Sequence, residues 1–278
     1  MDKVMKPKLI LFDLDGTLLD EQKRLSDANR EALERASAQG SEIVIATGRF
    51  YDGVPQKLLD LPYLRYFILM NGAKVYDRVE NKVLYQAEMD LATAEKIFDY
   101  SETLNATVDC YQNGVGWMSR QYYDHLEDYI EDPVVCRTVR SHRIPIDDFR
   151  ETVRRGGSTV QKIQFYFPDL SLRPSVMEWL SREVPHVVQS ISVSTNLELN
   201  DAQATKGKAL LALCQALDLD ISQTAAFGDG TNDLDMLRYA GIGVAMANGA
   251  PEVRGTADLI APTNGEDGVA FILNQWFV

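Results

Sequence analysis

Cysteine, histidine and long apolar runs are all scarce in this 278-residue chain. Its three cysteines, Cys110, Cys136 and Cys214, include no close-spaced pair, which argues against a disulfide framework or a thiolate metal site. No apolar run reaches the roughly 20 residues that a membrane-spanning helix needs. The segment 1–9 is too polar and too short for a signal peptide. These absences predict a cytoplasmic protein with reduced thiols.

Basic residues are also few. The chain carries 28 Lys and Arg against 41 Asp and Glu, and its formal net charge is −13. This balance disfavours nucleic acid and anionic membranes as partners, because both are bound through clustered Lys and Arg. An anionic small ligand would need a bound cation or a few local positive groups. Solubility alone accounts for most of the acidic residues.

The two ends of the chain alternate short apolar runs with amphipathic segments. This pattern predicts a doubly wound α/β domain with a parallel sheet. Ser26 is the expected N-cap of the first helix, and Gly40 is its expected stop. The predicted strands are 8–14, 41–46, 66–70, 224–227, 242–245 and 259–261, and the predicted helices are 26–39, 205–217, 232–240 and 268–275.

The middle of the chain has a different pattern. Residues 107–112 and 160–167 alternate apolar and polar side chains, which predicts antiparallel strands with one face in solvent. Helices are predicted at 90–104, 123–130, 146–154 and 172–183. We therefore expect an inserted α+β domain at 85–199 that divides a core domain into 1–84 and 200–278.

Polar clusters follow four of the predicted core strands. They are Asp13-Leu14-Asp15-Gly16-Thr17, Thr47-Gly48-Arg49, Asn71-Gly72 and Gly228-Asp229-Gly230-Thr231-Asn232-Asp233. Ligands of an open parallel sheet bind beyond the carboxyl ends of its strands, so clusters far apart in sequence can converge there. The sequence therefore predicts one polar site at this edge.

The acidic residues of these clusters point to a divalent cation. Asp13 and Asp15 are two residues apart in an extended segment and share a face, whereas Leu14 turns into the packing. Two such carboxylates are costly together unless a cation or a shared proton relieves them. Mg²⁺ is the economical choice because it takes one or two protein carboxylates and keeps waters. Taken alone, an Asp-x-Asp triplet is more often a polar strand end.

Two groups could bind an anion beside these acids. Thr47 and Gly48 offer a hydroxyl and a backbone amide near a helix start. Lys206 lies near the N-terminus of a predicted helix, where the helix dipole disfavours a positive charge. A lysine in that place suggests a ligand, although most helix lysines are merely solvated, and Lys208 has the same ordinary explanation.

The motifs DLDGT at Asp13–Thr17, TGR at Thr47–Arg49, Lys206-Gly207 and GDGTNDLDML at Gly228–Leu237 resemble those of the haloacid dehalogenase-like hydrolases. Their order, and the large insert after the second motif, are similar to the Cof-type branch of sugar and small-metabolite phosphatases. The resemblance implies a Rossmann-like core with an inserted α+β cap. It also implies a Mg²⁺-dependent phosphatase that acts on a small phosphorylated metabolite.

The resemblance assigns a role to each matching residue. Asp13 would be the nucleophile that forms an aspartyl phosphate, and Asp15 the general acid and base. Magnesium would be held by Asp13, the backbone carbonyl of Asp15, Asp229 and Asp233, the last directly or through water. The remaining expected residues bind phosphate or substrate or steady the loop: Leu14, Thr17, Thr47, Gly48, Arg49, Asn71, Lys206 and Asn232.

Other functions stay open at this point. A phosphotransferase or phosphomutase would use the same aspartyl phosphate, and a binding-only regulator could share the fold. The second alternative is disfavoured, because a protein without turnover has no physical need for the Asp13–Asp15 pair. In the insert, Asn113, Arg120 and Lys162 are weak candidates for substrate contact, and a surface position without a role is the more ordinary reading of each. The substrate and the oligomeric state cannot be predicted.

Overall fold

The chain forms two compact units in a computed structural model that describes residues 6–191 and 193–278. The core unit comprises Met1–Gln86 and Ala204–Val278, and the inserted unit comprises Ala87–Gln203. The insert therefore begins two residues after the predicted limit of 85 and ends four residues after the predicted limit of 199. Residues 1–5 of the predicted first segment lie outside the described residues.

An eight-stranded sheet lies at the centre of the core unit, in the order β16-β15-β14-β1-β2-β3-β4-β5. The strands from β16 through β3 are parallel, and β4 and β5 extend the sheet as an antiparallel hairpin that the sequence pattern did not predict. Its strands are β1 (Leu9–Phe12), β2 (Glu42–Ala46), β3 (Leu64–Leu69), β4 (Lys74–Asp77), β5 (Lys82–Gln86), β14 (Thr224–Gly228), β15 (Ile242–Met246) and β16 (Leu259–Ala261).

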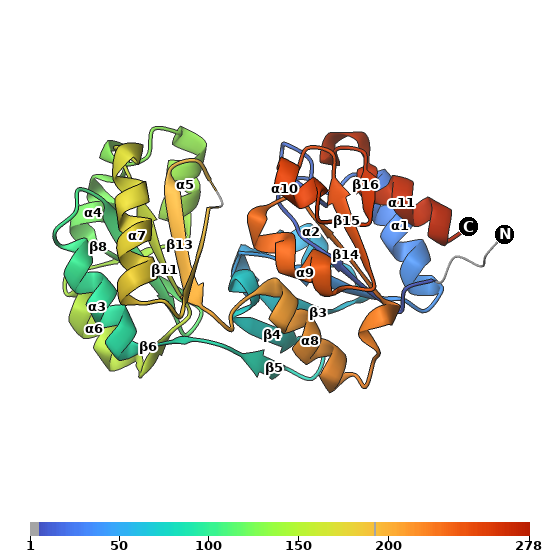
Figure 1. The fold of residues 1–278 in the computed structure, drawn as a ribbon, viewed down its shortest axis with the longest axis horizontal. Helices are drawn as coiled ribbons and strands as arrows, with labels where there is room; N and C mark the ends of the chain where they lie inside the picture. The colour runs from blue at the N-terminus through green and yellow to red at the C-terminus, as the bar shows by residue number, and fades with distance from the viewer. Residues whose placement is uncertain (1–5, 192) are drawn as a thin grey trace. The chain divides into compact units, whose positions relative to one another are not determined.

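Helices cover both faces of this sheet (Figure 1). The α-helices are α1 (Asp27–Ala38), α2 (Gln56–Leu59), α8 (Lys206–Ala216), α9 (Leu234–Tyr239), α10 (Pro251–Arg254) and α11 (Gly268–Trp276). The 3₁₀ turns are η1 (Tyr51–Gly53), η2 (Met70–Gly72), η5 (Ile221–Gln223), η6 (Thr231–Asp233) and η7 (Asn264–Glu266). Ser26 caps α1 by accepting a hydrogen bond from the Asn29 amide at 3.1 Å, as predicted.

The central strand β1 buries side chains on both faces, and this explains its unbroken apolar sequence. Leu9 and Leu11 belong to the same buried cluster as Leu210 of α8 and Met236 of α9. On the other face, Phe12 stacks on Phe227 with ring centroids 4.9 Å apart, and Phe227 meets Trp276 of α11 at 5.7 Å. The predicted α/β fold of the core is confirmed.

The inserted unit contains a six-stranded sheet in the order β12-β13-β11-β7-β8-β9 and a short β10–β6 pair. Its strands are β6 (Met89–Asp90), β7 (Thr107–Gln112), β8 (Val115–Ser119), β9 (Ile144–Ile146), β10 (Thr159–Val160), β11 (Lys162–Tyr166), β12 (Val187–Ser190) and β13 (Asn196–Asp201). Its helices are α3 (Leu91–Ser101), α4 (Arg120–Asp124), α5 (Pro133–Ser141), α6 (Phe149–Gly156) and α7 (Arg173–Glu183), with η3 (Leu126–Asp128) and η4 (Leu170–Leu172). One face of the large sheet packs its apolar side chains against α3, α6 and α7.

Some predicted helices of the insert differ from the structure. The helix predicted at 123–130 is wrong, because α4 ends at Asp124 and a separate 3₁₀ turn follows. The helix predicted at 146–154 begins only at Phe149, after the Asp148 cap, because 144–146 pairs with β8 as strand β9. Helix α5 was not predicted, although its cap Asp132 and the proline that follows are typical of a helix start.

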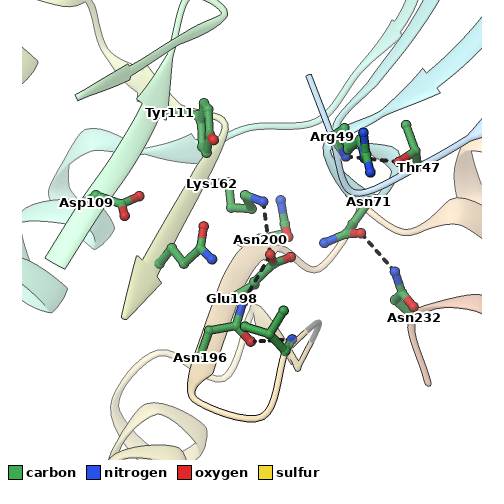
Figure 2. Close-up of polar contacts among 12 residues, drawn as sticks. Thr47, Arg49, Asn71, Asp109, Tyr111, Lys162, Asn196, Glu198, Asn200 and Asn232 are labelled. Carbon is green, nitrogen blue, oxygen red and sulfur yellow. Dashed lines mark hydrogen bonds and ion pairs between the residues drawn. The ribbon is translucent and has the colours of Figure 1, made fainter. Parts of the chain in front are cut away.

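The second face of the large inserted sheet is polar, but it is not exposed to solvent as predicted. It carries Thr107, Asp109 and Tyr111 of β7, Lys162, Gln164 and Tyr166 of β11, and Asn196, Glu198 and Asn200 of β13. Each of these residues is at most 6% exposed. Buried charges need partners. Asp109 pairs with Arg143 at 3.0 Å. Lys162 pairs with Glu198 at 3.2 Å (Figure 2). Alternation therefore predicted the strands correctly and the environment of their polar face incorrectly.

Among the residues that the structure describes, no helix has the length and apolar character to cross a bilayer.

Candidate active site

Two of the predicted motifs begin where a core strand is still hydrogen-bonded to its neighbour. The Asp13 amide donates to the Phe227 carbonyl at 3.0 Å, and the Thr47 amide donates to the Ile68 carbonyl at 2.9 Å. The residues just past β1 and β2 are therefore held by the sheet itself. This placement follows from the parallel topology, in which neighbouring strands end at the same edge.

Three carboxylates from opposite ends of the sequence meet at this edge. Asp13, Asp229 and Asp233 each offer an oxygen, and these oxygens lie within 4.8 Å of one another. Asp13 is buried after β1, whereas Asp229 follows β14 and Asp233 closes the turn η6. The structure thus brings together the first and last motifs that the sequence singled out.

Lys206 holds two of these acids. Its side chain is fully buried at the start of α8, and its Nζ lies 2.6 Å from Asp13 Oδ1 and 2.6 Å from Asp233 Oδ1. Burial by itself would lower the pKa of this lysine, but the charges of Asp13 and Asp233 outweigh burial and raise it. Lys206 is therefore a permanent cation inside the site.

One lysine does not balance three carboxylates. Burial, together with the charges of Asp233 and Asp229, raises the pKa of Asp13 well above its usual value in spite of Lys206. Burial and the charge of Asp233 raise the pKa of Asp229 to about 6. The protein alone therefore leaves this cluster short of positive charge, which is what a cation site with oxygen ligands requires.

The Asp229 loop is fixed by contacts with the first motif. Thr17 Oγ1 donates to Asp229 Oδ1 at 2.8 Å, so Thr17 joins the two motifs directly. Gly16 has a φ of +92°, and a Cβ at this position would overlap the Asp229 carboxylate. Asp233 Oδ2 accepts from the backbone amides of Asp229 and Gly230 at 3.0 and 2.9 Å. Asp233 thus orders the loop as well as pairing with Lys206.

The Asp15 carboxylate pairs with two other cations. Arg49 Nε and Nη2 donate to its two carboxylate oxygens at 2.8 and 2.7 Å, and Lys23 Nζ lies 2.8 Å from Oδ1. Burial raises the pKa of Asp15, but the hydrogen bonds and charges of Arg49 and Lys23 outweigh it, and the net pKa is lowered. Sequence reasoning did not predict Lys23, since its turn carries no motif.

The other predicted binding residues lie around η2 and the start of η6. Thr47 Oγ1 accepts from the Arg49 amide at 3.2 Å, and the Asn71 amide donates to the Thr47 carbonyl at 3.1 Å. Asn71 has a left-handed φ of 59°, and its side-chain oxygen accepts from Asn232 Nδ2 at 3.0 Å (Figure 2). Gly48 packs against Asn71, and the Leu14 side chain is buried, as predicted.

The three weak candidates of the insert have different surroundings. Asn113 donates to the Gly156 carbonyl at 2.7 Å, and Arg120 pairs with Asp147 at 2.6 Å; both are local surface contacts. Lys162, by contrast, is buried on the polar sheet face.

A family model described as haloacid dehalogenase-like hydrolase matches residues 10–273. The chain belongs to this family. It is therefore an enzyme of the hydrolase class, as the motifs predicted. Members of the family generally use a divalent metal, and the oxygen donors of Asp13, Asp229 and Asp233 suit one.

Similar proteins agree over almost the whole chain. The chain is 29% identical, over 97% of its length and 95% of the relative, to the Bacillus subtilis 5-amino-6-(5-phospho-D-ribitylamino)uracil phosphatase YcsE. It is 28% identical to Phosphatase YwpJ of the same organism, over 96% of this chain and 99% of that one. A solved haloacid dehalogenase-like hydrolase from B. subtilis shares 28% identity, with a TM-score of 0.81 and coverage of 96% and 99%.

Proposed function

We propose that this enzyme is a Mg²⁺-dependent phosphatase that hydrolyses small phosphorylated metabolites through an aspartyl phosphate on Asp13. The observation that carries the proposal is the convergence of Asp13, Asp229 and Asp233 around the buried Lys206. The relatives named as phosphatases support the same reaction class. When bound, the metal would neutralise the carboxylates and the phosphoryl oxygens.

Asp13 suits the role of nucleophile because its two oxygens differ. Oδ1 is held by Lys206, and Oδ2 has no hydrogen-bond donor among the described residues. In the first step Oδ2 bonds to phosphorus, the bond from phosphorus to the leaving oxygen breaks, and Asp15 gives its proton to that oxygen. In the second step water attacks phosphorus, its proton passes to Asp15, and the bond to Asp13 breaks to release inorganic phosphate.

Acid catalysis needs a protonated Asp15, whereas Arg49 and Lys23 favour its carboxylate. An incoming phosphate acts in the opposite direction, because a nearby negative charge raises the pKa of a carboxyl group. Proton uptake by Asp15 would then accompany substrate binding. Lys206, Thr47, Asn232 and the amides of Leu14 and Gly48 supply donors and charge for the phosphoryl oxygens, and phosphoryl transfer depends mainly on such positioning and charge stabilisation.

Release of inorganic phosphate tests the proposal. We expect a panel of sugar phosphates, flavin mononucleotide, pyridoxal phosphate and a phosphoribityl compound to include substrates in Mg²⁺, and activity to vanish reversibly with a chelator. Asp13→Asn should abolish turnover while the circular dichroism spectrum stays unchanged. An active Asp13→Asn protein would refute the nucleophile. Product on an added alcohol instead of free phosphate would establish a phosphotransferase.

A further inference from the structure

Arg49 is fixed in place by contacts along its whole length. Its Nε and Nη2 grip the two oxygens of Asp15 as a fork, its Nη1 donates to the Gly53 carbonyl at 2.9 Å, and its backbone amide donates to Thr47 Oγ1. A bidentate arginine–carboxylate pair fixes the plane of the carboxylate as well as its distance. Asp15 is therefore held in one orientation from the side of the second motif.

Lys23 reaches the same carboxylate from a tight turn in the first motif's loop. The Asp20 amide donates to the Arg24 carbonyl at 2.9 Å, the Lys23 amide donates to the Asp20 carbonyl at 2.9 Å, and Arg24 Nε pairs with the Asp20 side chain at 3.0 Å. Lys23 has a left-handed φ of 60° in this turn, and its Nζ lies 2.8 Å from Asp15 Oδ1. Its side chain is 55% exposed, against 28% for Arg49, so Lys23 is the freer of the two arms.

Together the two cations leave one acceptor site of the Asp15 carboxylate unoccupied. A carboxylate offers about four acceptor sites. Arg49 and Lys23 occupy two on Oδ1, and Arg49 occupies one on Oδ2. The acceptor site that remains is on Oδ2, so this oxygen is the one that can exchange a proton with a leaving group or a water.

We infer that Arg49 and Lys23 are positioning residues that orient Asp15 for proton transfer, Arg49 as the fixed arm and Lys23 as the movable one. The inference rests on the proposed function and deepens it. It differs from the sequence-based expectation that Arg49 binds phosphate or substrate, because two of its three guanidinium nitrogens face Asp15 and the third faces a backbone carbonyl. A misplacement of a catalytic group by about 1 Å can cost about 10²-fold in rate.

Two phosphate esters distinguish a positioning role of Arg49 from a role in phosphate binding. Hydrolysis of an alkyl phosphate, such as a hexose 6-phosphate, needs a proton on the leaving oxygen, whereas p-nitrophenolate leaves without one. We expect Arg49→Gln to lower kcat for the alkyl phosphate about 10- to 100-fold. With p-nitrophenyl phosphate the loss of kcat should stay below about threefold, and KM should change little for either ester.

Further variants test the two arms separately. Lys23→Met should also lose more kcat on the alkyl phosphate than on p-nitrophenyl phosphate, but the loss should be smaller than in Arg49→Gln. Lys23→Arg should have the wild-type kcat because it keeps the cation. Arg49→Lys keeps the charge but not the fork and should fall between wild type and Arg49→Gln. The matched controls are Lys57→Met and Arg238→Gln, both exposed residues of the core unit, which should leave both rates unchanged. Thermal melts check that each variant is folded.

The outcomes are distinct. An equal loss on both esters with a raised KM would show that Arg49 binds phosphate and would overturn the inference, as would unchanged kinetics in Arg49→Gln. A wild-type enzyme that releases no phosphate in Mg²⁺ from these esters or from any compound of the panel above would overturn the proposed function itself. If the wild type is active but the variants lose the same fraction of kcat on both esters, only the positioning role would be overturned.

Discussion

Asp229→Asn should make the metal-free protein more stable while it disables the site. Burial and Asp233 raise the pKa of Asp229 from 3.8 to about 6, a difference of about two units. At 1.36 kcal/mol per unit, ionised Asp229 costs the folded state at most about 3 kcal/mol near neutral pH. Partial exposure of the carboxyl reduces this to about 1–3 kcal/mol. The amide oxygen of asparagine can still accept the hydrogen bond from Thr17.

The sign of the pH dependence follows from the direction of the shift. A folded-state pKa above the unfolded value means that the folded protein binds the extra proton between about pH 4 and 6. Stability of the wild type therefore falls as the pH rises through this window, and the full cost is present above pH 6. Asp229→Asn lacks this loss, so the advantage of the variant should open from pH 4 and level off above pH 6.

Thermal melts followed by circular dichroism between pH 4 and 8 provide the assay. In chelator at pH 7.5, Tm of Asp229→Asn should exceed that of the wild type by roughly 2–12 °C, at about 2–4 °C per kcal/mol for a unit of this size. Mg²⁺ should raise the wild-type Tm and leave the variant nearly unchanged. Asp218→Asn, at an exposed left-handed position, is the matched control. A less stable variant in chelator, or an equal Mg²⁺ shift in both proteins, would refute the reasoning.

Three further predictions concern buried charge and backbone geometry. Lys206→Met should destabilise the core by about 3–5 kcal/mol in urea titrations, because it leaves Asp13 and Asp233 buried without their cation. Arg143→Met should cost a similar amount through Asp109, whereas the double variant Asp109→Leu/Arg143→Met should recover most of it; no recovery would argue against an unpaired charge as the cause. Gly72→Ala should cost more than about 2 kcal/mol, because φ is +105° and a Cβ would strike the backbone at the start of α8. Gly40→Ala, at φ +94° with open space around it, should cost about 1 kcal/mol, and equal losses in the two alanine variants would contradict the role of the close contact.

Sequence patterns predicted the core far better than the insert. The apolar run before Asp13 can only be a buried strand in an α/β context, and both faces of β1 are indeed covered. In the insert, residues 123–130 have a composition typical of a helix, but the structure has a 3₁₀ turn there. Tertiary packing can override local helix propensity in this way. The polar face of β7 and β11 was predicted to be exposed to solvent. Alternation of apolar and polar residues shows that a strand has two different faces, but it does not show whether the polar face is covered.

The location of the site was predictable from the sequence, but the contacts of its side chains were not. Strand ends and acidic spacing predicted that Asp13 and Asp229 would converge, since the parallel topology alone brings them to one edge. The partners of the two aspartates were not predictable: Asp15 pairs with Arg49 and Lys23, whereas Asp13 pairs with Lys206. Lys23 had no signal because a single lysine in a turn is ordinary.

Strand β1 lies between β2, about 30 residues downstream in the chain, and β14, more than 200 residues downstream. During synthesis at roughly 5–20 residues per second, β2 follows β1 within seconds, whereas β14 follows only after the whole insert has been made. The inserted unit is complete by Gln203, before β14 is made. The insert can therefore fold while the edge of β1 that pairs with β14 is still unpaired. A released chain truncated before Thr224 should thus contain an ordered insert and an unfinished core that lacks Asp229 and Asp233.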